Sequence, residues 1–171
     1  MNTLYDRMIR AAKLDKNLYE EVEADKGAMG QAMTVVILSS VAAGIGGFGK
    51  AGFGGFLGGL VLALIGWFIW SYLTYIIGTK ILPVPETRAD YGELLRVIGF
   101  SSSPGLIRVL GILPGFSGLV SGVAGIWMLI AMVIAVRQTL DYTSTTRAVA
   151  VCIIGWIIQV ITLVLFFGLF K

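Results

Sequence analysis

Few residues in this chain have the types and spacing that catalysis or nucleotide binding requires. The glycine-rich stretch from Gly44 to Lys50 is similar to the first part of a phosphate-binding loop, in which backbone N–H groups surround the phosphates. However, Ala51 stands where such a loop needs a serine or threonine to bind magnesium, and no strand precedes the stretch. The sequence therefore predicts a flexible hairpin between two helices there, and no nucleotide partner.

The usual groups of acid–base and nucleophilic catalysis are also missing from the sequence. The chain has no histidine, its single cysteine is Cys152, and no acidic residue lies inside an apolar stretch. A metal site is not expected either, because Cys152 has no acidic or cysteine neighbour. We therefore expect a protein that is not an enzyme and has no cofactor.

One charged residue, Arg108, lies well inside an apolar stretch. It follows Arg96 by 12 positions, about 18 Å along a continuous helix, so each arginine could extend toward one membrane interface. The other interpretation is a functional charge, because an ionisable side chain at membrane depth often marks a functional site. The sequence favours the first interpretation and leaves the second open.

Helices have to position these residues, because five apolar stretches make up most of the 171 residues. The composition is 57% hydrophobic and 13% charged, and the net charge of +3 is scattered between the stretches, which argues against a nucleic acid partner. About 20 apolar residues cross a hydrocarbon core of about 30 Å as a helix. The sequence therefore predicts an all-α polytopic membrane protein in which residues 28–171 form the membrane domain. Its five predicted spans are about 28–47, 54–78, 94–113, 117–136 and 148–170.

Lysine and arginine are distributed unevenly between the two sides of these spans. Basic residues near helix ends resist translocation, so the side that is richer in them faces the cytoplasm. Ten of the 13 lie on the side of the amino terminus, as do all ten acidic residues, whereas the other side receives only Lys50, Arg108 and Lys171. The sequence therefore places the amino terminus in the cytoplasm and the carboxyl terminus outside.

The first 27 residues form the only sizeable segment outside the predicted spans. Thr3 and Asn17 occupy cap positions of two short helices, and apolar residues recur on one helical face. Such a face either lies on the headgroup boundary or packs against the ends of the bundle. A sharper hypothesis is that this segment binds a basic partner protein. The acidic residues that would attract such a partner are Glu20, Glu21, Glu23 and Asp25.

The third apolar stretch contains an interruption. Pro104 removes a backbone N–H and disturbs the preceding turn, and Gly105 adds freedom, so we expect a kink or a break. Hydroxyl groups of the serines at 101–103 can bond the carbonyls that the break leaves free. Because broken helices at membrane depth often line a cavity, this feature keeps a transport function open.

Small residues also recur four positions apart within the predicted spans. This spacing lets neighbouring helix backbones approach closely. We expect most such faces to pack within the chain and the others to contact a second copy or a partner. The glycines concerned are Gly54, Gly55, Gly58, Gly59, Gly118 and Gly122.

Three stretches of the chain have the order and spacing of a known family of five-span membrane proteins. The stretch Gly99-Phe100-Ser101-Ser102-Ser103-Pro104 is similar to a glycine-aromatic-serine-x-x-proline motif, and the stretches 126–148 and 22–32 also match. On these residues the chain resembles the Ypt/Rab-interacting protein (YIP) domain family. The resemblance covers nearly the whole length of the chain.

This resemblance implies a non-enzymatic membrane protein whose eukaryotic relatives bind Rab GTPases and help to organise vesicle traffic. The chain lacks the aspartate-leucine-x-glycine-proline motif and the long cytoplasmic domain of those relatives, so Rab binding is not expected. Its compact form is similar to the prokaryotic branch, which implies the cell membrane of a prokaryote.

The sequence leaves two functions open. The first is a membrane scaffold or accessory subunit that contacts a protein partner, or a second copy of itself, through the amino-terminal helices and the loop 80–93. The alternative is a small permease or lipid-handling protein that uses the broken third helix and Arg108. Both functions place the chain among membrane lipids.

Overall fold

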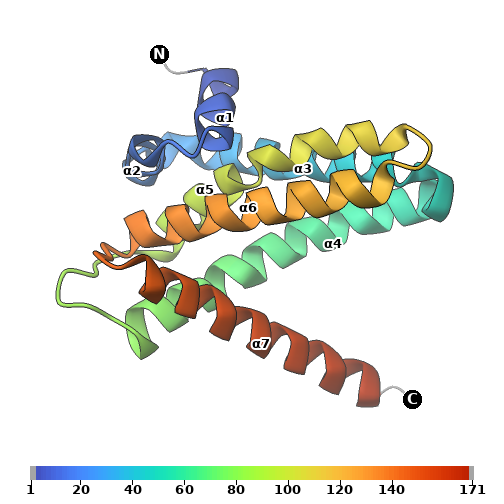
Figure 1. Ribbon diagram of the computed structural model, residues 1–171. Helices are drawn as coiled ribbons and strands as arrows, with labels where there is room; N and C mark the ends of the chain where they lie inside the picture. The colour runs from blue at the N-terminus through green and yellow to red at the C-terminus, as the bar shows by residue number, and fades with distance from the viewer. Residues whose placement is uncertain (1–2, 170–171) are drawn as a thin grey trace.

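Helices make up almost all of the structure, a computed structural model that describes residues 3–169 without the side chains of 48–53, 163 and 165–169. No strand occurs in the described range (Figure 1). The elements in chain order are α1 (Leu4–Ala12), α2 (Lys16–Ala24), the short η1 (Lys26–Ala28), α3 (Met29–Gly46), α4 (Phe48–Ile76), the π-helical turn η2 (Ile77–Ile81), α5 (Tyr91–Ser101), the 3-10 helix η3 (Ser103–Ile112), α6 (Ser117–Thr139) and α7 (Thr145–Leu169).

Five helical segments in the described range are long and apolar enough to cross a membrane, which confirms the predicted fold class. These segments are Lys26–Gly46, Gly54–Ile81, Tyr91–Ile112, Ser117–Thr139 and Thr145–Thr162. The loop expected from Gly44 to Lys50 is wrong in extent, because α3 continues to Gly46 and α4 begins at Phe48. Only Gly47 separates the two helices, so the chain reverses over one residue instead of a flexible hairpin.

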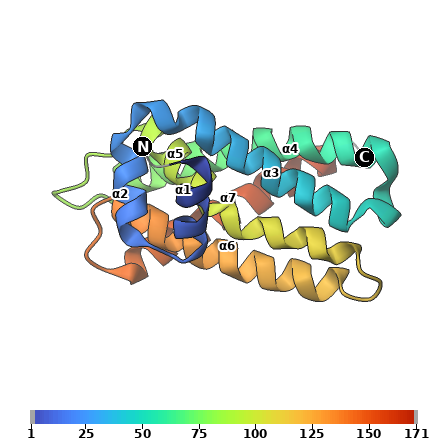
Figure 2. The same cartoon turned by 90° about the horizontal axis from the view of Figure 1, so that it is seen from above.

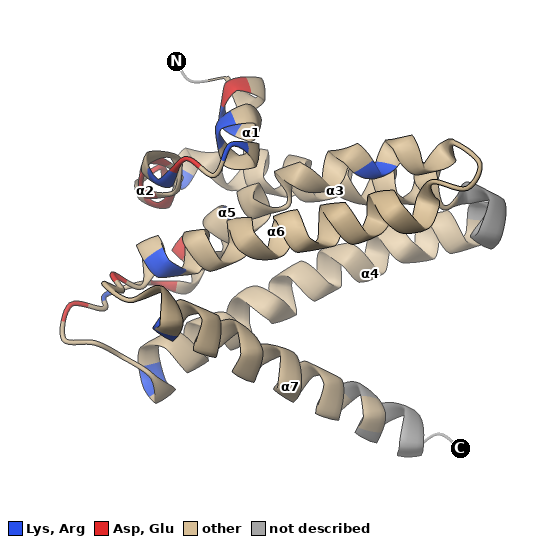
Figure 3. Cartoon of the chain, viewed as in Figure 1, with Lys and Arg blue, Asp and Glu red and all other residues tan. Residues whose placement is uncertain are grey.

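The helices form a bundle in which η3 lies between α3 and α6. Helix α4 packs on α3 and α5, and α7 contacts α6, α4 and η2. Figure 1 shows α7 diverging from the bundle toward the carboxyl terminus, and Figure 2 shows α1 and α2 gathered at one end of the molecule. Figure 3 shows that most of the charged residues gather at this same end. We call it the charged end of the bundle.

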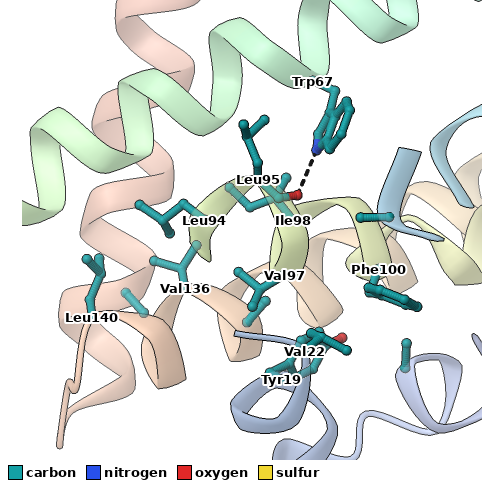
Figure 4. Packing of buried hydrophobic residues seen from close by; sticks show 14 of the residues in the cluster. Tyr19, Val22, Trp67, Leu94, Leu95, Val97, Ile98, Phe100, Val136 and Leu140 are labelled. Atoms are coloured by element: carbon teal, nitrogen blue, oxygen red, sulfur yellow. Dashed lines mark hydrogen bonds between the residues drawn. The ribbon is translucent and has the colours of Figure 1, made fainter. Parts of the chain in front are cut away.

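The buried core also lies toward the charged end. Tyr19 and Val22 of α2 pack with Val97 and Phe100 of α5, and all four side chains are fully buried (Figure 4). Elsewhere large apolar side chains face outward, as Leu62 does with 69% of its surface exposed. An exterior that is apolar over the length of the helices is what hydrocarbon solvent favours, so the chain is a multi-pass membrane protein.

The amino-terminal helices pack against the bundle through the apolar face that the sequence indicated. Ala11, Leu18 and Val22 are fully buried, so this face is covered by protein. Thr3 accepts the Asp6 backbone N–H as the predicted cap of α1. The predicted cap Asn17 is wrong: Asp15 accepts the Asn17 N–H at 3.0 Å, because α2 begins at Lys16. From here on, "the cap" means the two amino-terminal helices α1 and α2 together, not the residue at the start of a helix.

Candidate functional site

The third span breaks where the sequence indicated. Helix α5 ends at Ser101, and η3 begins at Ser103 with Pro104 in its first turn. The Ser101 hydroxyl donates to the Ile98 carbonyl and the Ser103 hydroxyl to the Phe100 carbonyl, both at 2.7 Å. These bonds confirm that the serine side chains satisfy carbonyls at the break.

Close packing against α3 accounts for the glycines of this motif. A Cβ at Gly99 would lie 2.8 Å from the Ala32 side chain, and a Cβ at Gly105 would collide with Ser39 and with the Met128 sulfur. Phe100 is fully buried against the cap. The motif therefore fixes the backbone of η3 between α3 and α6, and this position determines where Arg108 points.

The Arg108 side chain turns toward the middle of the bundle. Its Nη2 lies 3.1 Å from the Met128 sulfur, and Met128 is the twelfth of the 23 residues of α6. The Arg108 backbone, by contrast, lies only four residues before the end of η3, about 8 Å along a 3-10 helix. The side chain thus points away from the nearer end of η3, which favours a functional charge over snorkelling; the choice between the two interpretations stays a prediction.

Arg96, the other arginine of this span, is also not exposed at an interface. It is 4% exposed, and its Nε donates to the Val22 carbonyl at 2.9 Å. Its Nη2 donates to the Glu23 carbonyl. Both acceptors lie in the last turn of α2, where backbone carbonyls lack helical partners. Arg96 therefore joins the third span to the cap, a role that its sequence position alone did not indicate.

Arg108 lines a cavity of about 410 Å³ at membrane level, which we call the arginine cavity. Its polar lining includes Ser39 and Ser40 of α3, Ser101 and Ser102 near the break, and Gln159 of α7. Every acidic residue of the chain lies before position 26, between 86 and 93, or at 141, all toward the charged end. Within residues 3–169, no carboxylate is therefore positioned to neutralise Arg108.

A second pocket, of about 520 Å³, lies between the cap and the charged ends of α5 and α6. We call it the acidic pocket, because its lining includes four carboxylates and one arginine. These residues are Glu20, Glu23, Glu93, Asp141 and Arg137.

The four acidic residues that the sequence grouped together divide between two roles. Glu21 and Asp25 pair with Arg7, both at 2.9 Å or less, and Glu21 also accepts from Arg10 at 2.6 Å. Arg7 additionally donates to Gln31 of α3, so this network ties the cap to the bundle. Only the other two, Glu20 and Glu23, line the acidic pocket.

The environment of the acidic pocket raises the pKa of the Glu23 carboxyl. Burial of its carboxyl, together with the charges of Glu93 and Asp141, raises the pKa of Glu23 to about 7, although a hydrogen bond with Thr139 acts in the opposite direction. Glu23 therefore titrates near neutral pH. Sequence reasoning missed Glu93, Asp141 and Arg137 as pocket residues, because separate elements bring them together.

The glycines expected to pack helices within the chain face open space. A Cβ at Gly54, Gly58, Gly59, Gly118 or Gly122 would meet no described atom within 4 Å. The expectation that most of these faces pack intramolecularly is therefore wrong for these five positions. Gly55 lines a smaller pocket beside Arg108. Contact with a second copy or a partner stays a prediction.

Five membrane-spanning helices, a capped charged end and a broken third span define this chain as a multi-pass helical membrane protein. Its sequence matches the Yip1 domain model over residues 18–167, so the chain belongs to the Yip1 domain family. This match confirms the family resemblance. No curated protein and no solved structure matches the chain.

Proposed function

We propose that the protein is a non-enzymatic scaffold or accessory subunit of a prokaryotic cell membrane, with its charged end in the cytoplasm. The orientation follows from the excess of lysine and arginine at that end. The protein would bind a partner protein through the acidic pocket and the neighbouring loop between α4 and α5. The observation that carries this proposal is the acidic pocket itself, in which four carboxylates face one arginine.

The charge balance of the cap supports a basic partner. Within the cap, Arg7 and Arg10 are already engaged by Glu21, Asp15 and Asp25. The acidic pocket keeps an excess of negative charge, and this charge adds to burial in raising the pKa of Glu23. A lysine or arginine of a partner would relieve this repulsion, and such complementarity favours both the rate and the specificity of association.

The experiment is a crosslinking pull-down of the tagged full chain from its native membranes. The variant Glu20→Gln combined with Asp141→Asn removes two pocket charges, and asparagine suits the positive φ of 55° at Asp141. The control, Asp6→Asn, removes an exposed charge that lies outside both the pocket and the loop between α4 and α5. We expect one stoichiometric partner with the wild type and the control, and at least about a tenfold loss with the pocket variant. Equal recovery with both variants, or no stoichiometric partner, would contradict the proposal.

The arginine cavity favours a second function, a lipid-handling protein or small permease. The observation that supports it is an arginine of the third span whose cavity has no carboxylate in its lining. The test is movement of fluorescent lipid, or of solute, by the purified protein in liposomes. Movement that is lost in Arg108→Leu would support this function over the scaffold. No movement above protein-free liposomes would exclude it.

A further inference from the structure

The guanidinium of Arg108 needs a counter-charge, and none of the described residues around it supplies one. Among the described residues its polar contact is the Met128 sulfur, a weak acceptor, and the one acidic residue of the third span, Glu93, lies in the first turn of α5 at the charged end. A charge at membrane depth is costly unless an opposite charge or water compensates it. The compensating group must therefore come from outside the chain.

The arginine cavity continues into an apolar groove of about 870 Å³ between α6 and α7. The two share Trp70, Gly125, Leu129 and Met132 in their linings, so the polar and apolar spaces meet. The far part of the groove is lined by side chains such as Ile153 and Trp156. A site with a cation at one end and an apolar groove at the other fits an anionic molecule with a hydrocarbon tail.

A third space connects Arg108 with the end of the bundle opposite the charged end. It has a volume of about 340 Å³ and is lined mainly by small residues, including Gly44 of α3 and Gly59 of α4. Arg108, Ser40 and Ala63 line both this space and the arginine cavity. A headgroup from the lipid leaflet at that end would thus have a route to Arg108 between α3 and α4.

We propose that the arginine cavity binds one anionic phospholipid, with its phosphate on Arg108 and an acyl chain in the groove between α6 and α7. The planar guanidinium donates two parallel hydrogen bonds to a phosphate, a geometry that lysine lacks. The serine hydroxyls of the cavity offer further donors. This inference deepens the second candidate function, but a lipid can be bound without being moved.

The experiment is native mass spectrometry of the detergent-purified full chain after addition of equal amounts of phosphatidylglycerol and phosphatidylcholine. We expect one retained phosphatidylglycerol per chain and a preference of about tenfold over phosphatidylcholine, because the choline ammonium of the latter already balances its phosphate and would bring a second cation near Arg108. Arg108→Gln should abolish this preference. The control Arg88→Gln, which removes an exposed arginine of the loop between α4 and α5, should keep it.

A second pair of variants tests the acyl-chain groove without removing the charge. Gly125 lines both the cavity and the groove, and a Cβ there meets nothing within 4 Å, so Gly125→Leu adds a side chain to the junction without a collision at its Cβ. Gly122→Leu, one helical turn away and equally open, is the matched control. We expect phosphatidylglycerol retention to fall about tenfold in Gly125→Leu and to stay within twofold in Gly122→Leu.

Several outcomes would overturn the proposal. The first two are equal retention of the two lipids by the wild type and a preference for phosphatidylglycerol that survives Arg108→Gln. The others are retention of a free fatty acid in place of phospholipid, and a dimer in which a second copy of the chain fills the groove and which dissociates in Gly125→Leu. If Arg108→Gln does not fold, the Gly125 pair decides the question alone. Retention in this assay without movement in liposomes would reject lipid transport and leave the binding site supported.

Discussion

Replacing Arg96 with methionine should release the cap while leaving the membrane bundle folded. Arg96 is buried in α5 and donates to the last-turn carbonyls of Val22 and Glu23 in α2. Methionine keeps much of the apolar volume but neither donor. The packing of α2 on α5 would then have to hold the cap with two unsatisfied carbonyls at the interface.

The size of the expected destabilisation of cap docking follows from these two hydrogen bonds. A bond from a charged donor contributes about 1.5 to 3 kcal/mol, so the pair contributes about 3 to 6 kcal/mol. Removing the buried charge also removes its desolvation cost, which offsets part of this loss. A net destabilisation of about 2 to 4 kcal/mol remains, and it shifts the ratio of docked to released cap by about 30- to 700-fold.

Hydrogen exchange of backbone amides measures this release directly. In Arg96→Met, amides of α1 and α2 should exchange faster by that factor, whereas amides of α6 near its centre should be unchanged. Arg96→Lys should give an intermediate result, because an ammonium cannot reproduce the planar geometry of a guanidinium. Arg88→Met controls for the loss of a positive charge. An increase below about threefold in α1 and α2, or an equal increase in every helix, would refute the reasoning.

Three further predictions test other contacts. The pKa of Glu23 is raised to about 7 in the folded state, so its contribution to cap docking is complete below about pH 4.5 and is lost as the pH rises through 7. The loss amounts to about 1 kcal/mol after solvent screening. Glu23→Gln should remove this pH dependence from the hydrogen exchange of α2. Gly46→Ala should lower the free energy of unfolding by about 1 to 3 kcal/mol, because its Cβ would collide with the η3 backbone. Gly30→Ala on the same helix meets open space and should not destabilise the protein, and thermal melts compare the two variants. Tyr142→Phe should cost about 1 to 2 kcal/mol and loosen the loop between α4 and α5, because the Tyr142 hydroxyl donates to the Leu82 carbonyl at 2.7 Å; proteolysis of this loop measures the effect.

The sequence predicted those features that depend on local composition and periodicity. Five apolar stretches of spanning length required five helices, and Pro104 required a break in the third. The apolar face of the cap also followed from helical spacing, and Ala11 and Val22 lie in the core as that face requires. Each of these features is decided by residues that are near one another in the chain.

Features that depend on tertiary packing could not be predicted in the same way. The small residues at Gly54 and Gly118 had the spacing of packed helices, but spacing does not say which face turns inward, and both face open space. The direction of Arg108 depends on the 3-10 geometry of η3 and on the position of α6, which no local pattern encodes. The acidic pocket likewise required α2, α5 and the turn after α6 to meet.

The acidic pocket and the arginine cavity carry unbalanced charges of opposite sign, and the geometry of the third span keeps them apart. The distance along the third span from Glu93, through the end of α5, to Arg108 in η3 is about 26 Å. Substitutions usually affect one another only when they lie within about 10 Å. The two sites should therefore act independently. Neutralising Glu20 and Asp141 should leave phosphatidylglycerol retention within about twofold of wild type, and a larger change would show that the third span transmits binding from one end to the other.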